Sequence, residues 1–187
     1  MSLAKLVKPK DYKVLGVDAS TNSFAFCLIQ NKKPIKWGEI VFQGSDVYER
    51  ILDAKRKIKA LKGHIDYDFV AIEAAVSVKS VATGLKMAYI FGTIMSELIN
   101  DNIDVIEIHP ITWQSYIGNK NFTKAEKEEV KINNPNRSDN WIKAKIREMR
   151  KQKTINFVKD LGVVTENDNV ADATGIAWYA ANETLGK

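Results

Sequence analysis

The sequence contains few of the residues that form disulfides and zinc sites. Cys27 is the single cysteine among the 187 residues, so no disulfide can form within the chain. It lies in an apolar run, where a buried side chain is expected and not a reactive thiol. The two histidines, His64 and His109, are too few for a zinc site that lacks cysteine ligands. We therefore expect neither a disulfide-stabilised nor a zinc-binding protein.

Long hydrophobic runs are also missing. No stretch approaches the roughly 18 apolar residues of a membrane-spanning helix, and the first ten residues, MSLAKLVKPK, lack the apolar centre of a signal peptide. The sequence shows no internal repeat and no low-complexity linker. With 45% hydrophobic and 27% charged residues, the chain is predicted to form one soluble domain over residues 1–187, cytoplasmic and without membrane association.

The positive charge of the chain is concentrated in one segment. The net charge is +5, yet residues 119–153 hold eleven Lys or Arg against five Asp or Glu, a local +6. Phe122 and Trp141 lie among these basic residues, and such a mixture suits the phosphates and unstacked bases of a nucleic acid. The alternative is a solvated charged face. We treat the segment as a basic insert, whose expected DNA-binding residues are Lys120, Lys124, Lys127, Lys143, Lys145, Arg147 and Arg150.

Apolar runs and their spacing predict an α/β fold. Five strands are expected, near residues 14–17, 24–29, 33–43, 69–75 and 103–108. The first three form a meander, and their almost wholly apolar character predicts that both faces of the sheet are covered. Helices are expected near residues 46–62, 81–100, 110–116, 138–159 and 168–183.

Three acidic residues stand in or beside apolar elements. Asp18 ends the first strand, Glu73 interrupts the fourth, and Asp172 lies in the last helix between two alanines. A carboxylate at the edge of a core is costly unless it is paired or binds a metal, so these positions indicate function. Asp172 is also one helical turn after Asp168 and Asn169, which places the three on one face. The alternative reading is local capping, of the turn by Asp18 and of the helix by Asp168.

These acids, in this order along the chain, resemble the RuvC family of Holliday-junction resolvases within the ribonuclease H-like superfamily. The resemblance rests on GVDAST around Asp18, AIEAA around Glu73, the helix GLKMAYIFG and NVADATGIA around Asp172. It implies a ribonuclease H-like five-stranded mixed sheet flanked by helices. It further implies a metal-dependent, structure-selective endonuclease that cleaves four-way junctions and other branched DNA.

The resemblance also implies a site for two Mg²⁺ ions, for which Mn²⁺ may substitute. Two ions about 4 Å apart can deprotonate a water and neutralise the leaving oxygen, and Mg²⁺ binds through a few carboxylates together with water and phosphate. Asp18 would bridge the ions, Glu73 and Asp172 would hold one each, and Asp168 or Asn169 would complete the site. Because a charged oxygen supports a second metal better than a neutral one, Asp168→Ala is expected to cost more activity than Asn169→Ala.

Three positions depart from the family pattern. Asn169 stands where an acid or a histidine is usual, Val76 replaces an aromatic base wedge, and Gln114 replaces a lysine after the fifth strand. The departures are typical of a divergent, phage-type member, which would work in a host cytoplasm. The candidates that remain to stabilise transition-state charge are Lys120, Lys124 and Lys127.

Two other functions agree with the same sequence. One is a ribonuclease H-like nuclease that acts on RNA or on RNA–DNA hybrids. The other is a catalytically weak module that binds branched DNA, against which the intact Asp18, Glu73 and Asp172 argue.

The helix expected at residues 81–100 has more apolar residues than one packing stripe needs. Either neighbouring helices of the same chain cover the surplus, or a second copy of the chain does so across a two-fold axis. The resemblance favours the second arrangement, a homodimer that presents two sites to a four-way junction. The sequence identifies no branch-migration partner.

Overall fold

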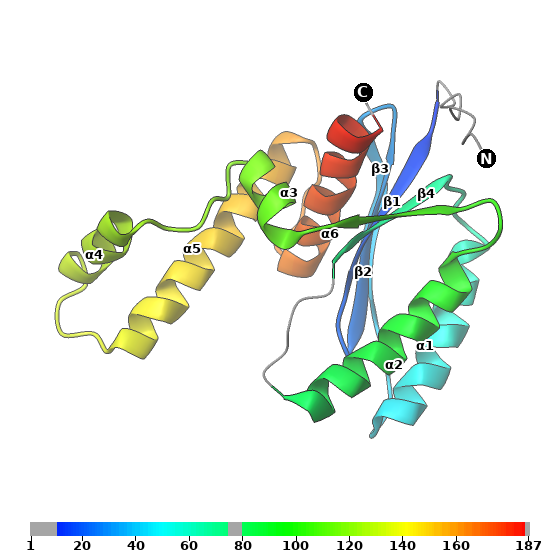
Figure 1. The fold of residues 1–187 in the computed structure, drawn as a ribbon, viewed down its shortest axis with the longest axis horizontal. Helices are drawn as coiled ribbons and strands as arrows, with labels where there is room; N and C mark the ends of the chain where they lie inside the picture. The colour runs from blue at the N-terminus through cyan, green and yellow to red at the C-terminus, as the bar shows by residue number, and fades with distance from the viewer. Residues whose placement is uncertain (1–10, 75–79, 186–187) are drawn as a thin grey trace, which may run out of the picture.

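The computed structural model describes residues 11–74 and 80–185, and its centre is a mixed five-stranded sheet (Figure 1). The strands lie in the order β3-β2-β1-β4-β5. The first three pair antiparallel, whereas β4 and β5 extend the sheet parallel to β1. The predicted α/β fold with a mixed five-stranded sheet is therefore confirmed. The strands are β1 (Lys13–Ala19), β2 (Ser23–Gln30), β3 (Lys33–Val41), β4 (Phe69–Glu73) and β5 (Asp104–Ile108).

Helices cover both faces of the sheet, as the apolar strands predicted. The helices are α1 (Val47–Lys62), α2 (Val81–Leu98), α3 (Pro110–Tyr116), α4 (Lys124–Ile132), α5 (Asp139–Asp160) and α6 (Asp168–Tyr179), which continues as a π-helical turn over Ala180–Thr184. Helices α1 and α2 pack on the face that contains Leu15 and Val17, and α3 and α6 pack on the face that contains Val14 and Cys27. Among the described residues, none of these helices has the length and hydropathy to cross a membrane.

The local caps near the acidic residues are formed by their neighbours. The Ser20 hydroxyl accepts from the backbone N–H groups of Asn22 and Ser23, at 3.1 and 3.0 Å, and closes the turn after β1. At the start of α6 the side-chain oxygen of Asn167 accepts the backbone N–H of Asn169 at 2.9 Å. Asn167 is therefore the N-cap, and the alternative that Asp168 caps this helix is wrong. Capping does not account for the acid at position 168.

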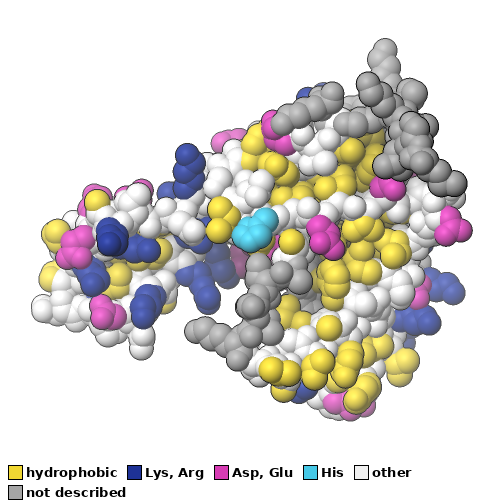
Figure 2. Space-filling model, in the orientation of Figure 1, with side chains coloured by type: hydrophobic (Ala, Val, Ile, Leu, Met, Phe, Trp, Pro, Cys, Tyr) yellow, Lys and Arg dark blue, Asp and Glu magenta, His cyan; other side chains and the backbone are white. Residues whose placement is uncertain are grey.

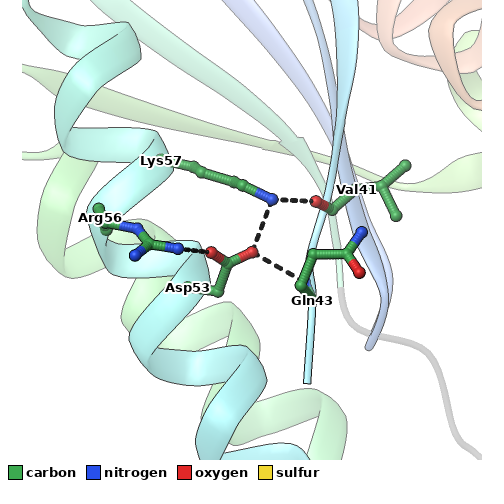
Figure 3. A network of polar contacts seen from close by, with 5 residues as sticks. All are labelled: Val41, Gln43, Asp53, Arg56 and Lys57. Atoms are coloured by element: carbon green, nitrogen blue, oxygen red, sulfur yellow. Dashed lines mark hydrogen bonds and ion pairs between the residues drawn. The ribbon is translucent and has the colours of Figure 1, made fainter. Parts of the chain in front are cut away.

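A buried acid joins α1 to the end of the meander (Figure 3). Asp53 is only 5% exposed, and its carboxylate accepts from the Lys57 ammonium at 2.7 Å, from the backbone N–H of Gln43 at 2.8 Å and from the Arg56 guanidinium. Lys57 also donates to the carbonyl of Val41 at 2.8 Å. Hydrogen bonds from Lys57 and Gln43 lower the pKa of Asp53 to about 2. The network therefore fixes α1 against the end of β3 and the residues that follow it.

We expect Asp53→Asn to lower the melting temperature at neutral pH, because an amide cannot replace a carboxylate that accepts from two cations. The folded state holds the pKa of Asp53 below its unfolded value, so this stabilisation is present above about pH 4 and is lost as the pH falls toward 2. Melting curves of both proteins between pH 2 and 7 should converge at the acid end. A difference that stays constant with pH would contradict a role for the charge.

Candidate functional site

The strand register brings three acidic side chains into one row. Asp18 on β1 pairs with Ala25 on β2, which pairs with Glu39 on β3. On the other side, β4 runs parallel to β1 in a register that puts Glu73 beside Asp18. Residues of one row project from the same face of a sheet. Ala25 packs against Ala171 of α6, so the row faces that helix.

Helix α6 lies directly on β1 because the strand has no side chain at the crossing point. A Cβ added to Gly16 would lie 2.2 Å from the carbonyl oxygen of Ala173 and 2.5 Å from the Cβ of Ala177. No real Cβ tolerates such contacts, so only glycine permits this approach. The close crossing brings Asp172 of α6 over the end of β1, where Asp18 lies.

The acids form an electrostatic cluster with little compensating charge. Burial, followed by the charges of Glu73, Asp168 and Glu39, raises the pKa of Asp18 to about 7. Burial, followed by the charges of Asp18, Glu73 and Asp168, raises the pKa of Asp172 to about 8. Both pKa values are raised by carboxylates of other elements, so Asp18 of β1 and Asp172 of α6 lie near Glu73 of β4 and near Asp168. The structure brings together Asp18, Glu73, Asp168 and Asp172, as the sequence predicted.

Two of these acids have fixed partners that the sequence analysis missed. Glu73 Oε1 accepts from Trp113 Nε1 at 2.7 Å, and Trp113 is fully buried under α6. Asp168 forms an ion pair with Lys151 of α5. A buried indole N–H needs an acceptor, so the sequence could have predicted that Trp113 has a hydrogen-bond partner. Nothing in the sequence identifies that partner as Glu73.

Asn169 is held by a third missed residue, Glu39. The Asn169 side-chain nitrogen donates to Glu39 Oε1 at 2.7 Å, and that of Asn167 donates to Glu39 Oε2 at 2.6 Å. The only hint of Glu39 in the sequence is an acid in the third strand. Its pairing with α6 depends on how that helix crosses the sheet.

Two hollows flank the acids. One, of about 360 Å³, is lined by Asp18 and Glu73 together with Gly84, Met87 and Phe91 of α2. The other, of about 470 Å³, has Asp172 in its wall and is otherwise mainly basic. Its cationic lining residues come from α5 and are Lys143, Arg147, Arg150 and Lys151.

The expected DNA-binding residues lie on two helices and the loop before them. Lys143, Lys145, Arg147 and Arg150 are on α5, Lys124 and Lys127 are on α4, and Lys120 precedes α4. Helix α4 and the start of α5 form an arm that extends away from the sheet, and basic side chains are scattered over it (Figures 1 and 2).

Arg150, which lines the basic hollow together with Asp172, is held by two polar side chains. Its guanidinium donates to Gln114 Oε1 at 2.6 Å and to Asn119 Oδ1 at 3.4 Å. Gln114, which replaces the family's lysine, therefore holds a cation of α5 in that region. Val76, at the position of the expected base wedge, lies outside the described residues.

The site suits a divalent cation. Carboxylate and amide oxygens are the donors that Mg²⁺ and Mn²⁺ prefer. Within residues 11–74 and 80–185, no Lys or Arg forms an ion pair with Asp18, Glu73 or Asp172. In the same part of the chain, no group of three or more His, Cys, Asp or Glu side chains is arranged closely enough to hold a metal ion. The fit therefore rests on uncompensated charge, which a divalent cation would offset.

Comparison with known proteins agrees with this fold. The family model described as crossover junction endodeoxyribonuclease RuvC matches residues 14–133, a range that includes Asp18 and Glu73. No curated protein sequence matches the chain. The low identities to solved structures given below agree with the expected divergence.

Among solved structures, Thermus thermophilus RuvC aligns with a TM-score of 0.64 and 12% identity, over 93% of this chain and 96% of that chain. T. thermophilus RuvC in complex with a Holliday junction substrate gives 0.62 and 13%, over 92% and 97%. The yeast mitochondrial Holliday junction resolvase gives 0.50 and 14%, over 92% and 81%. The family match, over more than half of the sequence, and the shared fold lead to one conclusion: this chain belongs to the RuvC family of crossover junction endodeoxyribonucleases.

Proposed function

We propose that the chain is a metal-dependent, structure-selective endonuclease that hydrolyses phosphodiester bonds in four-way junctions and other branched DNA. The observation that supports this most directly is the cluster of Asp18, Glu73 and Asp172 at the end of β1, with a basic hollow against Asp172. Acids alone would repel a DNA backbone. The adjacent cations make the approach of a phosphate favourable.

Each residue of the cluster has a distinct part in this proposal. Divalent ions, when bound, supply a deprotonated water and neutralise the charge of the leaving oxygen. Asp18 would bridge two Mg²⁺ or Mn²⁺ ions, Glu73 and Asp172 would hold one each, and Asp168 or Asn169 would complete the ligand set. Trp113 keeps the Glu73 carboxylate in one orientation through its 2.7 Å hydrogen bond.

The proposal is tested by offering the protein labelled four-way junction, linear duplex and RNA–DNA hybrid, each with Mg²⁺, with Mn²⁺ and with EDTA. We expect cleavage of the junction with either metal, none with EDTA, and little cleavage of the linear duplex. Preferential cleavage of the hybrid would instead identify a ribonuclease H-like enzyme. Junction binding without cleavage under every metal condition would identify a binding module.

The basic hollow is proposed to hold the DNA backbone next to the acids. Lys143 and Arg147 line it. Among the described residues, neither side chain forms an ion pair with an acidic residue. Lys145 differs, because it pairs with Glu148 at 3.1 Å. Lys143 and Arg147 are therefore the pair whose removal should affect phosphate contacts most directly.

We expect the double variant Lys143→Ala, Arg147→Ala to reduce the salt dependence of junction binding, since each phosphate contact contributes a slope of roughly 0.9 in log affinity against log salt concentration. The control is Lys33→Ala, Lys59→Ala, which removes the same charge. Lys33 lies at the far end of the hairpin from Asp18, and Lys59 lies on α1, across the sheet from α6. If the wild type and the Lys143→Ala, Arg147→Ala variant give equal slopes of log affinity against log salt concentration, these two residues belong to a solvated charged face and do not contact DNA.

The exposed face of α2 supports a homodimer. The buried stripe of this helix is Ile90, Ile94 and Leu98. Outside it, Val81, Leu85 and Tyr89 are 78%, 51% and 47% exposed, and Figure 2 shows hydrophobic side chains gathered over the lower part of the view, where α2 lies. An apolar face of this kind favours an interface. We propose that a second copy covers it, because two opposed sites match the near two-fold symmetry of a four-way junction.

We expect sedimentation at micromolar concentration to show a dimer, and the variant Leu85→Asp, Tyr89→Asp to sediment as a monomer, because a carboxylate buried in an apolar interface is costly. Val164→Asp is the matched control, since Val164 is 82% exposed and lies outside α2. It should remain dimeric. A wild-type protein that is monomeric with and without junction DNA would contradict the dimer and point to single nicks in branches.

A further inference from the structure

Glu39 is the one acid of the strand row whose two carboxylate oxygens both accept from α6. Oε1 accepts from Asn169 at 2.7 Å and Oε2 from Asn167 at 2.6 Å. Glu39 therefore joins β3 to the start of α6 through two amide donors.

The contact determines which way the Asn169 amide points. A side-chain amide has a donor end and an acceptor end, and only the donor end can face a carboxylate. With Nδ2 directed at Glu39, the Asn169 oxygen is directed elsewhere. Asn169 and Asp172 are three residues apart on α6, so the two side chains share one face of the helix.

We propose that Glu39 is a positioning residue that presents the Asn169 oxygen to the metal site and supplies, through the amide, the negative charge that an acid at position 169 would have supplied. A neutral ligand is improved when its far side is hydrogen-bonded to a carboxylate, which fixes its orientation and raises its basicity. The inference rests on the proposed metal-dependent function, and it selects Asn169 over Asp168 as the ligand.

The surroundings of Asp168 agree with this selection. Its carboxylate is engaged by Lys151, and a cation so close competes with a metal ion for the same oxygens. Among the described residues, the partner of the Asn169 side-chain nitrogen is an anion, Glu39, and not a cation. Asn169→Ala is therefore expected to weaken metal binding more than Asp168→Ala, which is the opposite of the order expected from charge alone.

Calorimetric titration of the full chain with Mn²⁺, without DNA, tests the role of Glu39. We expect Glu39→Ala to raise the dissociation constant by about 10- to 100-fold, as is usual when the partner that orients a metal ligand is lost. Asp53→Asn is the matched control, because it also removes a carboxylate with several hydrogen bonds but lies on α1. It should bind Mn²⁺ as the wild type does.

A second substitution separates positioning from a general effect on folding. Asn169→Asp should restore Mn²⁺ binding in the Glu39→Ala background, because either oxygen of a carboxylate can bind a metal ion and no orienting partner is needed. In the wild-type background, Asn169→Asp should not improve Mn²⁺ binding. The new carboxylate would repel Glu39, whose Oε1 lies 2.7 Å from the side-chain nitrogen of Asn169 in the wild type. Failure of Asn169→Asp to rescue Glu39→Ala would overturn the proposal.

Melting temperatures in EDTA show whether the Glu39→Ala variant is folded. If it is not, the Mn²⁺ affinity of Glu39→Gln is compared with that of the wild type instead, because glutamine keeps the size of the side chain and one acceptor oxygen. Unchanged Mn²⁺ affinity in the folded variant would overturn the role of Glu39. If Asp18→Asn nevertheless abolishes cleavage, the proposed function stands without it. A wild-type protein that binds no Mn²⁺ would reject the metal-dependent function itself.

Discussion

Replacing Asp18 by Asn is expected to abolish junction cleavage and to leave junction binding within a few fold of the wild type. The substitution keeps the size of the side chain and removes its charge. Asp18 lies at the centre of the acidic cluster, where burial, followed by the charges of its acidic neighbours Glu73, Asp168 and Glu39, raises its pKa. It is the residue proposed to bridge two cations, so no neighbouring ligand can replace its charge. The basic hollow contains no part of this side chain and should bind DNA as before.

Cleavage with Mg²⁺ and binding without metal should be measured on the same labelled junction. Asp66→Asn is the control, because Asp66 is an exposed acid that pairs with Lys13 and should have wild-type activity. Turnover by Asp18→Asn would refute the site. Loss of binding together with cleavage would show instead that Asp18 contributes to substrate affinity.

Gly16→Ala is expected to produce the second large effect, a loss of both stability and cleavage. The new Cβ would lie 2.2 Å from the Ala173 carbonyl and 2.7 Å from the Ala177 backbone nitrogen, so α6 must move away from β1. Overpacking of this kind costs about 1–3 kcal/mol, or roughly 2–4 °C in melting temperature per kcal/mol for a chain of this size. Because α6 contains Asp172, a displacement of about 1 Å could cost roughly 100-fold in rate.

Gly38→Ala is the matched control for this prediction, because Gly38 is also a strand glycine. A Cβ added to Gly38 in β3 would meet its nearest atom, Phe26 Cε1, at 3.5 Å, which is ordinary van der Waals contact, and glycine inside a strand is less favourable than alanine. This variant should be as stable as the wild type or more so. Thermal melting measures the loss of stability, and cleavage assays at a temperature below the melting points of the variant and the wild type measure the loss of activity separately. A Gly16→Ala protein that cleaves at the wild-type rate would show that cleavage does not require the close crossing of α6 and β1.

Periodicity was sufficient to predict the strands and the principal helices of this fold. The alternation of residues in β1 and β2 is local, and the apolar stripe of α1, which includes Val47, Ala54 and Ile58, is buried as its spacing required. The same local reasoning placed Asp18 at a strand end and Asp172 inside a helix. These features depend on neighbours a few residues away, which a sequence displays directly.

The residues that complete the site could not be predicted in this way. Glu39 and Asn169 are 130 residues apart, and their contact requires both the pairing of β3 with β2 and the angle at which α6 crosses the sheet. Trp113 reaches Glu73 across 40 residues for the same reason. The alternative that Asp168 caps α6 was wrong for a smaller reason, since Asn167 and Asp168 are adjacent and both are favourable N-cap residues.

The packing of α6 on β1 also has a consequence for the protein during its synthesis. Val14, Cys27 and Ala71 belong to the cluster that Ile176 and Ala177 of α6 cover. A chain still attached to the ribosome has made the sheet strands long before that helix emerges, so one side of the nascent sheet stays bare and open to chaperones or to aggregation. The acidic row is equally incomplete at that stage. A nascent chain without α6 also lacks Asp172, so the proposed metal site forms only after the last helix has been made.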